Sequence, residues 1–166
     1  MSQKLTEGFV CSNLSDNFEG LSFKKIPISF VEENSVKISI KAASLNFPDL
    51  LMTQGKYQNK PNLPFALGME GAGIVSEVGS SSCSFKEGDE VMFGSWGHGA
   101  IAKEIVLPES MLSQKPKSYS FEEAAAFKTV YLTAFVGLIR RGNLVEGENL
   151  LVHGATGGVG LSLIHI

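Results

Sequence analysis

Apolar and polar residues alternate in short segments along the first two thirds of the chain. Val36, Ile38 and Ile40 alternate with polar residues from Ser35 onward. This period of two predicts a half-buried strand with one face in water. Similar patterns predict further strands over residues 71–78, 90–93 and 100–107.

Glycines and prolines separate these segments. Residues 46–68 contain prolines and glycines at short intervals, which predict a loop-rich stretch. Residues 1–35 are only weakly patterned, and within them we expect a hairpin over 21–30. Short strands with turns of this kind between them predict a small β structure that is closed or nearly closed.

The pattern becomes helical in the last third of the chain. Ser120 predicts a helix N-cap, and Glu122 and Glu123 follow where the helix dipole favours negative charge. Residues 124–141 continue as a helical run, in one helix or two, which ends in two arginines and a glycine. We therefore expect a domain boundary near Ser118.

A short apolar segment then leads into a glycine-rich turn. Residues 150–153 are typical of a strand buried in a parallel sheet. The turn that follows is Gly154-Ala155-Thr156-Gly157-Gly158-Val159-Gly160. Glycines let a pyrophosphate approach backbone N–H groups at a helix start, so the turn predicts a dinucleotide site. A plain glycine-rich loop is the alternative.

Composition and charge narrow the classes of function. The chain has 166 residues, 43% of them hydrophobic and 19% charged, as in globular proteins. Its formal net charge of −3 gives no electrostatic basis for binding nucleic acid or an anionic membrane. No run of about 18 apolar residues occurs, and the first residues lack the apolar stretch of a signal peptide. Cys11 and Cys83 stand in unrelated contexts, so we expect no disulfide framework and a cytoplasmic location.

Several stretches match one protein family, in the family's order. They include Gly68-Met69-Glu70-Gly71-Ala72-Gly73, Phe85-Lys86-Glu87-Gly88-Asp89 and the stretches 41–49, 54–57, 63–65, 122–126 and 153–160. On these residues the chain resembles the medium-chain dehydrogenase/reductase superfamily and its zinc-independent NADPH:quinone oxidoreductase branch. The resemblance implies a mostly β, chaperonin-10-like domain, a partly open barrel that carries the substrate site. An α/β Rossmann domain follows it in the family.

The resemblance also implies that the chain is the N-terminal part of a longer protein. It assigns residues 1–118 to the β domain and 119–166 to the beginning of the Rossmann domain. In the family, a helix after Gly160, a second parallel strand and the residue that selects NAD or NADP should follow. The chain instead ends Leu161-Ser162-Leu163-Ile164-His165-Ile166. This ending resembles a translated sequencing adapter, so we expect 162–166 to be read-through and the Rossmann domain to be truncated.

The residues at the family's zinc-ligand positions predict that no metal is bound. Zinc-dependent members have a cysteine where this chain has Asn46 and a histidine where it has Met69. An amide and a thioether bind zinc poorly beside thiolate and imidazole. The closely spaced cysteines of structural-zinc relatives are also missing. We expect Glu70, next to Met69, to be a structural carboxylate.

Without zinc, another group must polarise the substrate oxygen as hydride arrives. The amide of Asn46 and the phenol of Tyr57 can each donate a hydrogen bond. The resemblance places both at the nicotinamide and substrate pocket, and we predict both as catalytic. A turn-forming asparagine and a tyrosine that only packs are the alternatives. Asp49 either orients Tyr57 or the ribose, or caps a loop.

The resemblance implies a nicotinamide cofactor, which we expect to be NADPH, with NADH as the alternative. The predicted cofactor-binding residues are Asn46, Thr133, Gly154, Thr156, Gly157, Gly158, Val159 and Gly160. For Thr133, a helical threonine that bonds its own backbone is the alternative.

The implied function is hydride transfer from NAD(P)H to a quinone or an activated alkene or carbonyl, by a full-length homodimer. An enoyl-thioester reductase is the alternative within this class. A non-catalytic structural or RNA-binding member is the alternative from another class, and Asn46, Tyr57 and the acidic balance argue against it. The glycine-rich turn argues against an isolated chaperonin-10-like module.

Overall fold

The computed structural model describes residues 4–79, 84–95 and 99–166. The chain divides into two compact units, Met1–Ala126 and Phe127–Ile166. The family's own domain boundary, which we place between residues 118 and 119, stays a prediction. The serines that follow Gly79, together with Cys83, Trp96 and His98, lie outside the described residues. Within those residues, no helix has the length and apolar character needed to cross a membrane.

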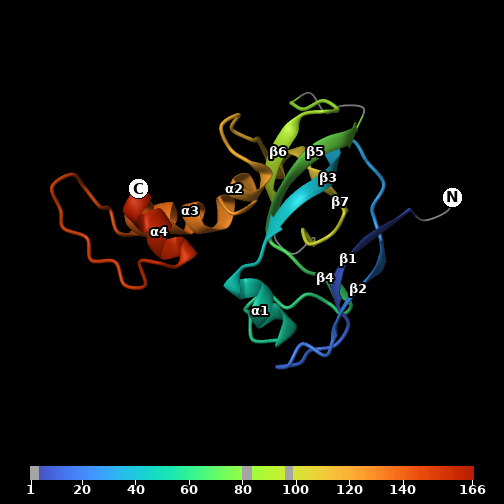
Figure 1. Ribbon diagram of the computed structural model, residues 1–166, viewed down its shortest axis with the longest axis horizontal. Helices are drawn as coiled ribbons and strands as arrows, with labels where there is room; N and C mark the ends of the chain where they lie inside the picture. Colours follow the sequence, from blue (N-terminus) through green and yellow to red (C-terminus); the bar gives the residue numbers. More distant parts are fainter. Residues whose placement is uncertain (1–3, 80–83, 96–98) are drawn as a thin grey trace. The chain divides into compact units, whose positions relative to one another are not determined.

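A five-stranded antiparallel sheet forms the larger part of the first unit (Figure 1). Its strands, in spatial order, are β7 (Glu104–Pro108), β3 (Ser35–Ser44), β5 (Glu70–Val78), β6 (Glu90–Gly94) and β8 (Leu112–Gln114). The strands predicted from Ser35 and over 71–78 and 90–93 are thereby confirmed. The strand predicted over 100–107 is shorter than expected. Its first residues bond instead to the irregular segment before β5, through Ala100 N–H to Gly68 O at 3.1 Å and Ile101 N–H to Leu67 O at 2.8 Å.

A second sheet contains three strands in the order β2-β1-β4. These strands are β1 (Leu5–Cys11), β2 (Leu21–Pro27) and β4 (Phe65–Ala66). The hairpin predicted over 21–30 is wrong, because this segment contains one strand, β2, which ends at Pro27 and pairs with β1 from Leu21 to Pro27. The sequence analysis did not predict β1, because Thr6 and Gly8 occupy two of its buried positions and its alternation of apolar and polar residues is therefore weak. In the described residues the two sheets are linked by an isolated bridge between Gly8 of β1 and Ala102, and they do not close into one ladder, as expected for a mostly β fold with a partly open barrel.

The core of the five-stranded sheet consists of apolar residues, most of them valine, isoleucine or leucine. Its fully buried members include Val36, Ile38, Val91, Phe93 and Leu107. A smaller cluster joins Ala72 of the sheet to Ala124 and Ala125 of α2 (Phe121–Ala125). Small side chains let this short helix lie close against the strands. The predicted cap of α2 is confirmed, because Ser120 Oγ accepts the Glu123 N–H at 3.1 Å.

The loop-rich stretch 46–68 contains one helix that the sequence analysis missed, α1 (Phe47–Thr53). Asn46 is its N-cap and a proline stands in its first turn. Proline is compatible with a helix start, because the first N–H groups of a helix have no partner within it. α1 directly follows the end of β3 (Figure 1). This placement brings the predicted site residue Asn46 to the junction between strand and helix.

The second unit contains α3 (Lys128–Phe135), a π-helical segment (Val136–Arg141) and α4 (Gly158–His165). The predicted helical run is broken between α2 and α3. The strand predicted over 150–153 is wrong: the segment is irregular, with Leu151 79% exposed. A strand needs a neighbour to satisfy its backbone groups, and no strand in the described residues pairs with it. The expectation that the chain ends before the helix after the glycine turn is also wrong, since α4 forms there.

Candidate functional site

A small polar network lies where β3 ends and β5 begins. Ser44 and Glu70 are direct partners in the antiparallel ladder, so their side chains meet. Ser44 Oγ donates to Glu70 Oε1 at 2.6 Å. The Asn46 amide nitrogen donates to both of them, to Ser44 Oγ and to Glu70 Oε1, each at 3.0 Å. Glu70 is only 1% exposed, so the Asn46 amide is hydrogen-bonded to a buried carboxylate.

Asp49 ties the backbone of the same region together. It is 2% exposed, and its Oδ2 accepts the Asn46 N–H at 2.9 Å while its Oδ1 accepts the Gly68 N–H at 3.1 Å. Burial raises the pKa of the Asp49 carboxyl, the two backbone N–H groups lower it, and the nearby charge of Glu70 raises it. Both oxygens are engaged by backbone, so Asp49 caps the loop rather than orienting Tyr57.

Tyr57 packs, partly buried, against an apolar cluster of Cys11, Met52, Phe65, Leu67 and Met69. Among the described residues its hydroxyl makes no hydrogen bond. Met69, at one of the family's zinc-ligand positions, is 6% exposed inside this cluster. A thioether packed among apolar side chains is a core residue and makes a poor zinc ligand.

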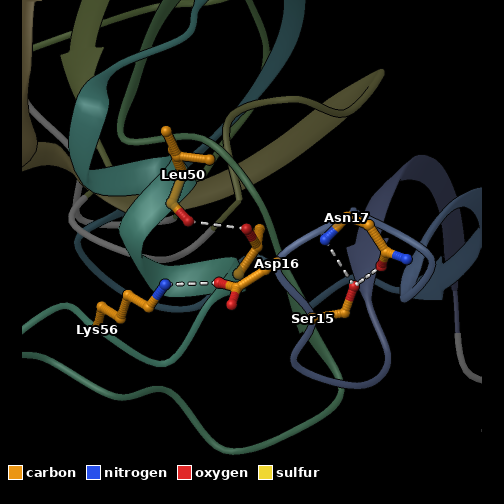
Figure 2. Close-up of polar contacts among 6 residues, drawn as sticks. Ser15, Asp16, Asn17, Leu50 and Lys56 are labelled. Carbon is orange, nitrogen blue, oxygen red and sulfur yellow. Dashed lines mark hydrogen bonds and ion pairs between the residues drawn. The ribbon is translucent and has the colours of Figure 1, made fainter.

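The chain before Tyr57 is anchored to the loop between β1 and β2. Figure 2 shows Lys56 Nζ paired with Asp16 Oδ1 at 2.6 Å, beside the end of α1. The Ser15 N–H also donates to the Thr53 carbonyl at 3.0 Å, and Thr53 Oγ1 donates to Leu50 O at 2.8 Å. The ion pair is exposed and contributes little by itself. The backbone contact is the firmer constraint on the segment that carries Tyr57.

The remaining predicted site residues belong to the second unit. Thr133 is exposed on α3, and its Oγ1 donates to the Thr129 carbonyl at 2.6 Å, one turn back, as the alternative for this residue anticipated. The glycine turn leads directly into α4, with Gly157 as its N-cap. In the turn, Gly154 adopts a positive φ of 66° and accepts the Gly157 N–H at 3.0 Å.

The glycine turn is closed so tightly that one of its positions admits no side chain. A Cβ on Gly160 would lie 2.1 Å from the Gly154 carbonyl oxygen. Thr156, Gly158 and Val159 are exposed. The turn therefore presents backbone at the start of α4, the arrangement that can receive a phosphate.

The predicted site residues divide between the two compact units of the chain. Asn46 and Tyr57 belong to the first unit, on either side of the Met69–Glu70 segment: Met69 packs with Tyr57, and Glu70 bonds Asn46. Thr133 and the glycine turn belong to the second unit, where α4 packs on α3 through Ser162 Oγ and Val130 O at 3.1 Å. The sequence analysis missed Ser44, because its contact with Glu70 depends on strand register.

Comparisons with known proteins identify the family. Residues 32–117 match the model for the alcohol dehydrogenase GroES-like domain. The chain is 41% identical over 133 residues to the quinone oxidoreductase-like protein 2 homolog of Nematostella vectensis, covering 80% of this chain and 36% of that protein.

Solved structures agree with this assignment. The human synaptic vesicle membrane protein VAT-1 homolog-like protein superposes with a TM-score of 0.88 at 34% identity, covering 96% of this chain and 51% of that one. The CurK enoyl reductase superposes with a TM-score of 0.85 at 28% identity, covering 96% and 50%. The chain thus spans about a third to a half of the length of these relatives. It belongs to the alcohol dehydrogenase GroES-like domain family, within the medium-chain dehydrogenase/reductase superfamily, as the sequence motifs predict.

Proposed function

We propose that the protein, in its full-length form, transfers hydride from NAD(P)H to a quinone or an activated alkene or carbonyl, without zinc. The observation that carries the proposal is the first unit's site. An asparagine held by Ser44 and Glu70 and a core methionine stand where zinc-dependent members have metal ligands. The relative named quinone oxidoreductase-like supports this substrate class. A cytoplasmic homodimer using NADPH is part of the same proposal.

The chemistry assigns distinct tasks to the chain's residues. A bound nicotinamide cofactor supplies the hydride. The turn from Gly154 to Gly160 would hold its pyrophosphate against backbone N–H groups at the start of α4. Hydride addition to a quinone or enone builds negative charge on the substrate oxygen, which a hydrogen-bond donor stabilises. Tyr57 has a hydroxyl with no partner in the described residues, so it is suited to meet that charge.

We expect purified full-length enzyme to oxidise NADPH with 1,4-benzoquinone at a rate that a chelator does not change. The reason is that Asn46 and Met69 offer an amide and a buried thioether in place of zinc ligands. Metal analysis measures the zinc content, and steady-state rates with and without chelator measure the dependence of activity on a metal. Stoichiometric zinc that a chelator removes together with the activity would refute the zinc-independent mechanism.

An enoyl-thioester reductase is the second candidate, supported by the similarity to the CurK enoyl reductase. The same assay with a short 2-enoyl thioester in place of the quinone distinguishes the two. A kcat/KM higher for the thioester favours this candidate. A folded enzyme that oxidises NADPH with neither substrate would favour a non-catalytic member of the superfamily.

Replacing Tyr57 with phenylalanine is expected to lower kcat about tenfold and to leave the NADPH dissociation constant nearly unchanged. The hydroxyl would act mainly in the transition state, and removing one such donor costs on the order of a hundredfold where water cannot replace it. Water can enter a partly exposed site, which reduces the effect. Tyr119→Phe removes the same hydroxyl elsewhere in the first unit and serves as the control. An unchanged kcat in Tyr57→Phe would show that Tyr57 only packs.

A further inference from the structure

The C-terminal end of α1 is completed by a segment far away in the sequence. A helix leaves its last carbonyl groups without partners inside it. The N–H groups of Gly55 and Lys56 return to the last turn of α1 and take two of these carbonyls, at 3.1 and 2.8 Å. The Thr53 carbonyl instead accepts the N–H of Ser15, at 3.0 Å. Ser15 belongs to the loop between β1 and β2, residues 12–20, which is called the β1–β2 loop below.

A leucine of the β1–β2 loop lies against the turn that ends α1. Gly55 has a φ of 68°, the left-handed conformation that reverses the chain after a helix. A Cβ on Gly55 would lie 2.7 Å from Leu14 Cδ1, so the Leu14 side chain covers this turn closely. Leu14 is 48% exposed and is therefore not a core residue. Because Tyr57 follows the turn by two residues, Leu14 supports the point from which the tyrosine segment starts.

The β1–β2 loop is held in shape by its own hydrogen bonds. Its ends are joined where the Ser12 N–H donates to the Gly20 carbonyl at 2.9 Å. Ser15 Oγ accepts the N–H groups of Asn17 and Glu19 at 3.2 Å each, and Figure 2 shows Ser15 with Asn17. A loop with joined ends and internal hydrogen bonds keeps its conformation without help from α1. It can therefore act as a fixed support for the turn.

The same stretch of chain supports the ring of Tyr57. Cys11, the residue directly before the β1–β2 loop, is fully buried in the apolar cluster on which Tyr57 packs. The ring thus rests on the end of β1, while Leu14 covers the turn before it. The exposed ion pair of Lys56 adds little, because water and salt screen it. The contacts that fix the tyrosine segment are therefore apolar and backbone contacts.

We propose that Leu14 is a positioning residue, which acts with the β1–β2 loop to fix the turn before Tyr57 and thereby sets where the phenol meets the substrate oxygen. The inference rests on the proposed function, in which Tyr57 stabilises negative charge on that oxygen. A catalytic group that is displaced by about 1 Å can lose on the order of a hundredfold in rate. Loosening the loop therefore lowers turnover and leaves cofactor binding unchanged.

A double-mutant cycle in the full-length enzyme tests whether Leu14 acts through Tyr57. We expect Leu14→Ala to lower kcat with 1,4-benzoquinone about fivefold, less than removal of the hydroxyl does, because the hydroxyl is displaced and not lost. In the Tyr57→Phe background, the same substitution should change kcat less than about twofold. The NADPH dissociation constant and the KM for the quinone should stay within about twofold of wild type in each variant.

Two further variants separate positioning from a general loss of structure. Leu14→Met keeps an apolar side chain of similar volume against the turn and should hold kcat within about twofold of wild type. Leu5→Ala removes a leucine that is 55% exposed at the other end of β1, and it is the matched control. An unchanged kcat in Leu14→Ala overturns the proposal. So does an equal fall in kcat with and without the Tyr57 hydroxyl.

Limited proteolysis without substrate separates this inference from the proposed function. Trypsin cleaves after Lys56, whereas Pro61 protects the bond after Lys60. Cleavage requires the segment to open, so we expect Leu14→Ala to raise the rate of cleavage between Lys56 and Tyr57 about tenfold, as followed by mass spectrometry. Equal cleavage rates in Leu14→Ala and wild type overturn the positioning role. Faster cleavage of the variant, in an enzyme that reduces neither quinone nor enone, would instead reject the proposed function alone.

Discussion

Replacing Gly68 with alanine is expected to lower the free energy of unfolding by about 3 kcal/mol or more. Gly68 has a φ of 107°, a conformation that L side chains rarely adopt. A Cβ there would lie 2.5 Å from Ile101 N and 2.9 Å from Ala100 N, both backbone atoms that cannot move aside easily. Urea denaturation followed by circular dichroism measures the loss.

Gly88→Ala provides the matched control for this effect. Gly88 also has a positive φ, 89°, but a Cβ on it would meet nothing within 4 Å. Its replacement therefore shows the backbone strain alone, about 1–2 kcal/mol. Equal losses in the two variants would mean that the contact with the Ala100–Ile101 segment does not constrain Gly68.

Asp49→Ala is expected to lower the free energy of unfolding by about 2–4 kcal/mol, because each buried N–H without a partner costs about 1–3 kcal/mol. The two N–H groups are those of Asn46 and Gly68. Removing a buried carboxylate offsets part of this loss. Asp89→Ala removes an aspartate that accepts the Lys86 N–H at 3.0 Å in an exposed turn, and it should cost less. If Asp49→Ala lowered the free energy of unfolding no more than Asp89→Ala does, Asp49 would not stabilise the fold through the two backbone N–H groups.

The pH dependence of Asp49→Asn gives an independent check. Because burial raises the pKa of Asp49 in the folded state, the native protein binds more protons than the unfolded chain between the two pKa values. The wild type therefore loses stability as pH rises through that window, and the asparagine variant does not. We expect the stability advantage of the wild type over Asp49→Asn to shrink as the pH rises above 3.8, the ordinary pKa of an aspartate. An advantage that grows with pH would show that the folded pKa is lowered.

Much of the fold could be predicted from local pattern. The alternation at Val36, Ile38 and Ile40 belongs to a strand buried on one face. Such a pattern is the same whichever strands pair with it. The Ser120 cap was predictable because its hydrogen bonds join residues three apart. The helix α1 was missed because proline and glycine suggested a loop, although proline also suits a helix start.

The glycine-rich turn and its strand show the limit of local pattern. An apolar run over 150–153 has the composition of a buried parallel strand, yet it forms no strand among the described residues. A parallel strand depends on neighbours reached through a crossover, which local composition does not contain. The turn itself is local, and its glycines have the tight geometry that the motif predicts.

The sequence by itself determined the β-rich class of the first unit, the family and the candidate residues Asn46 and Tyr57. Each of these depends on periodicity or on contiguous motifs, which are present in the chain before it folds. Only the tertiary structure decided how the Asn46 amide is oriented and why Gly68 must be glycine. The first depends on Ser44 facing Glu70 across two paired strands, and the second on the Ala100–Ile101 backbone passing close by. Contacts between residues so far apart in sequence arise from strand register and chain crossing, which no local pattern specifies.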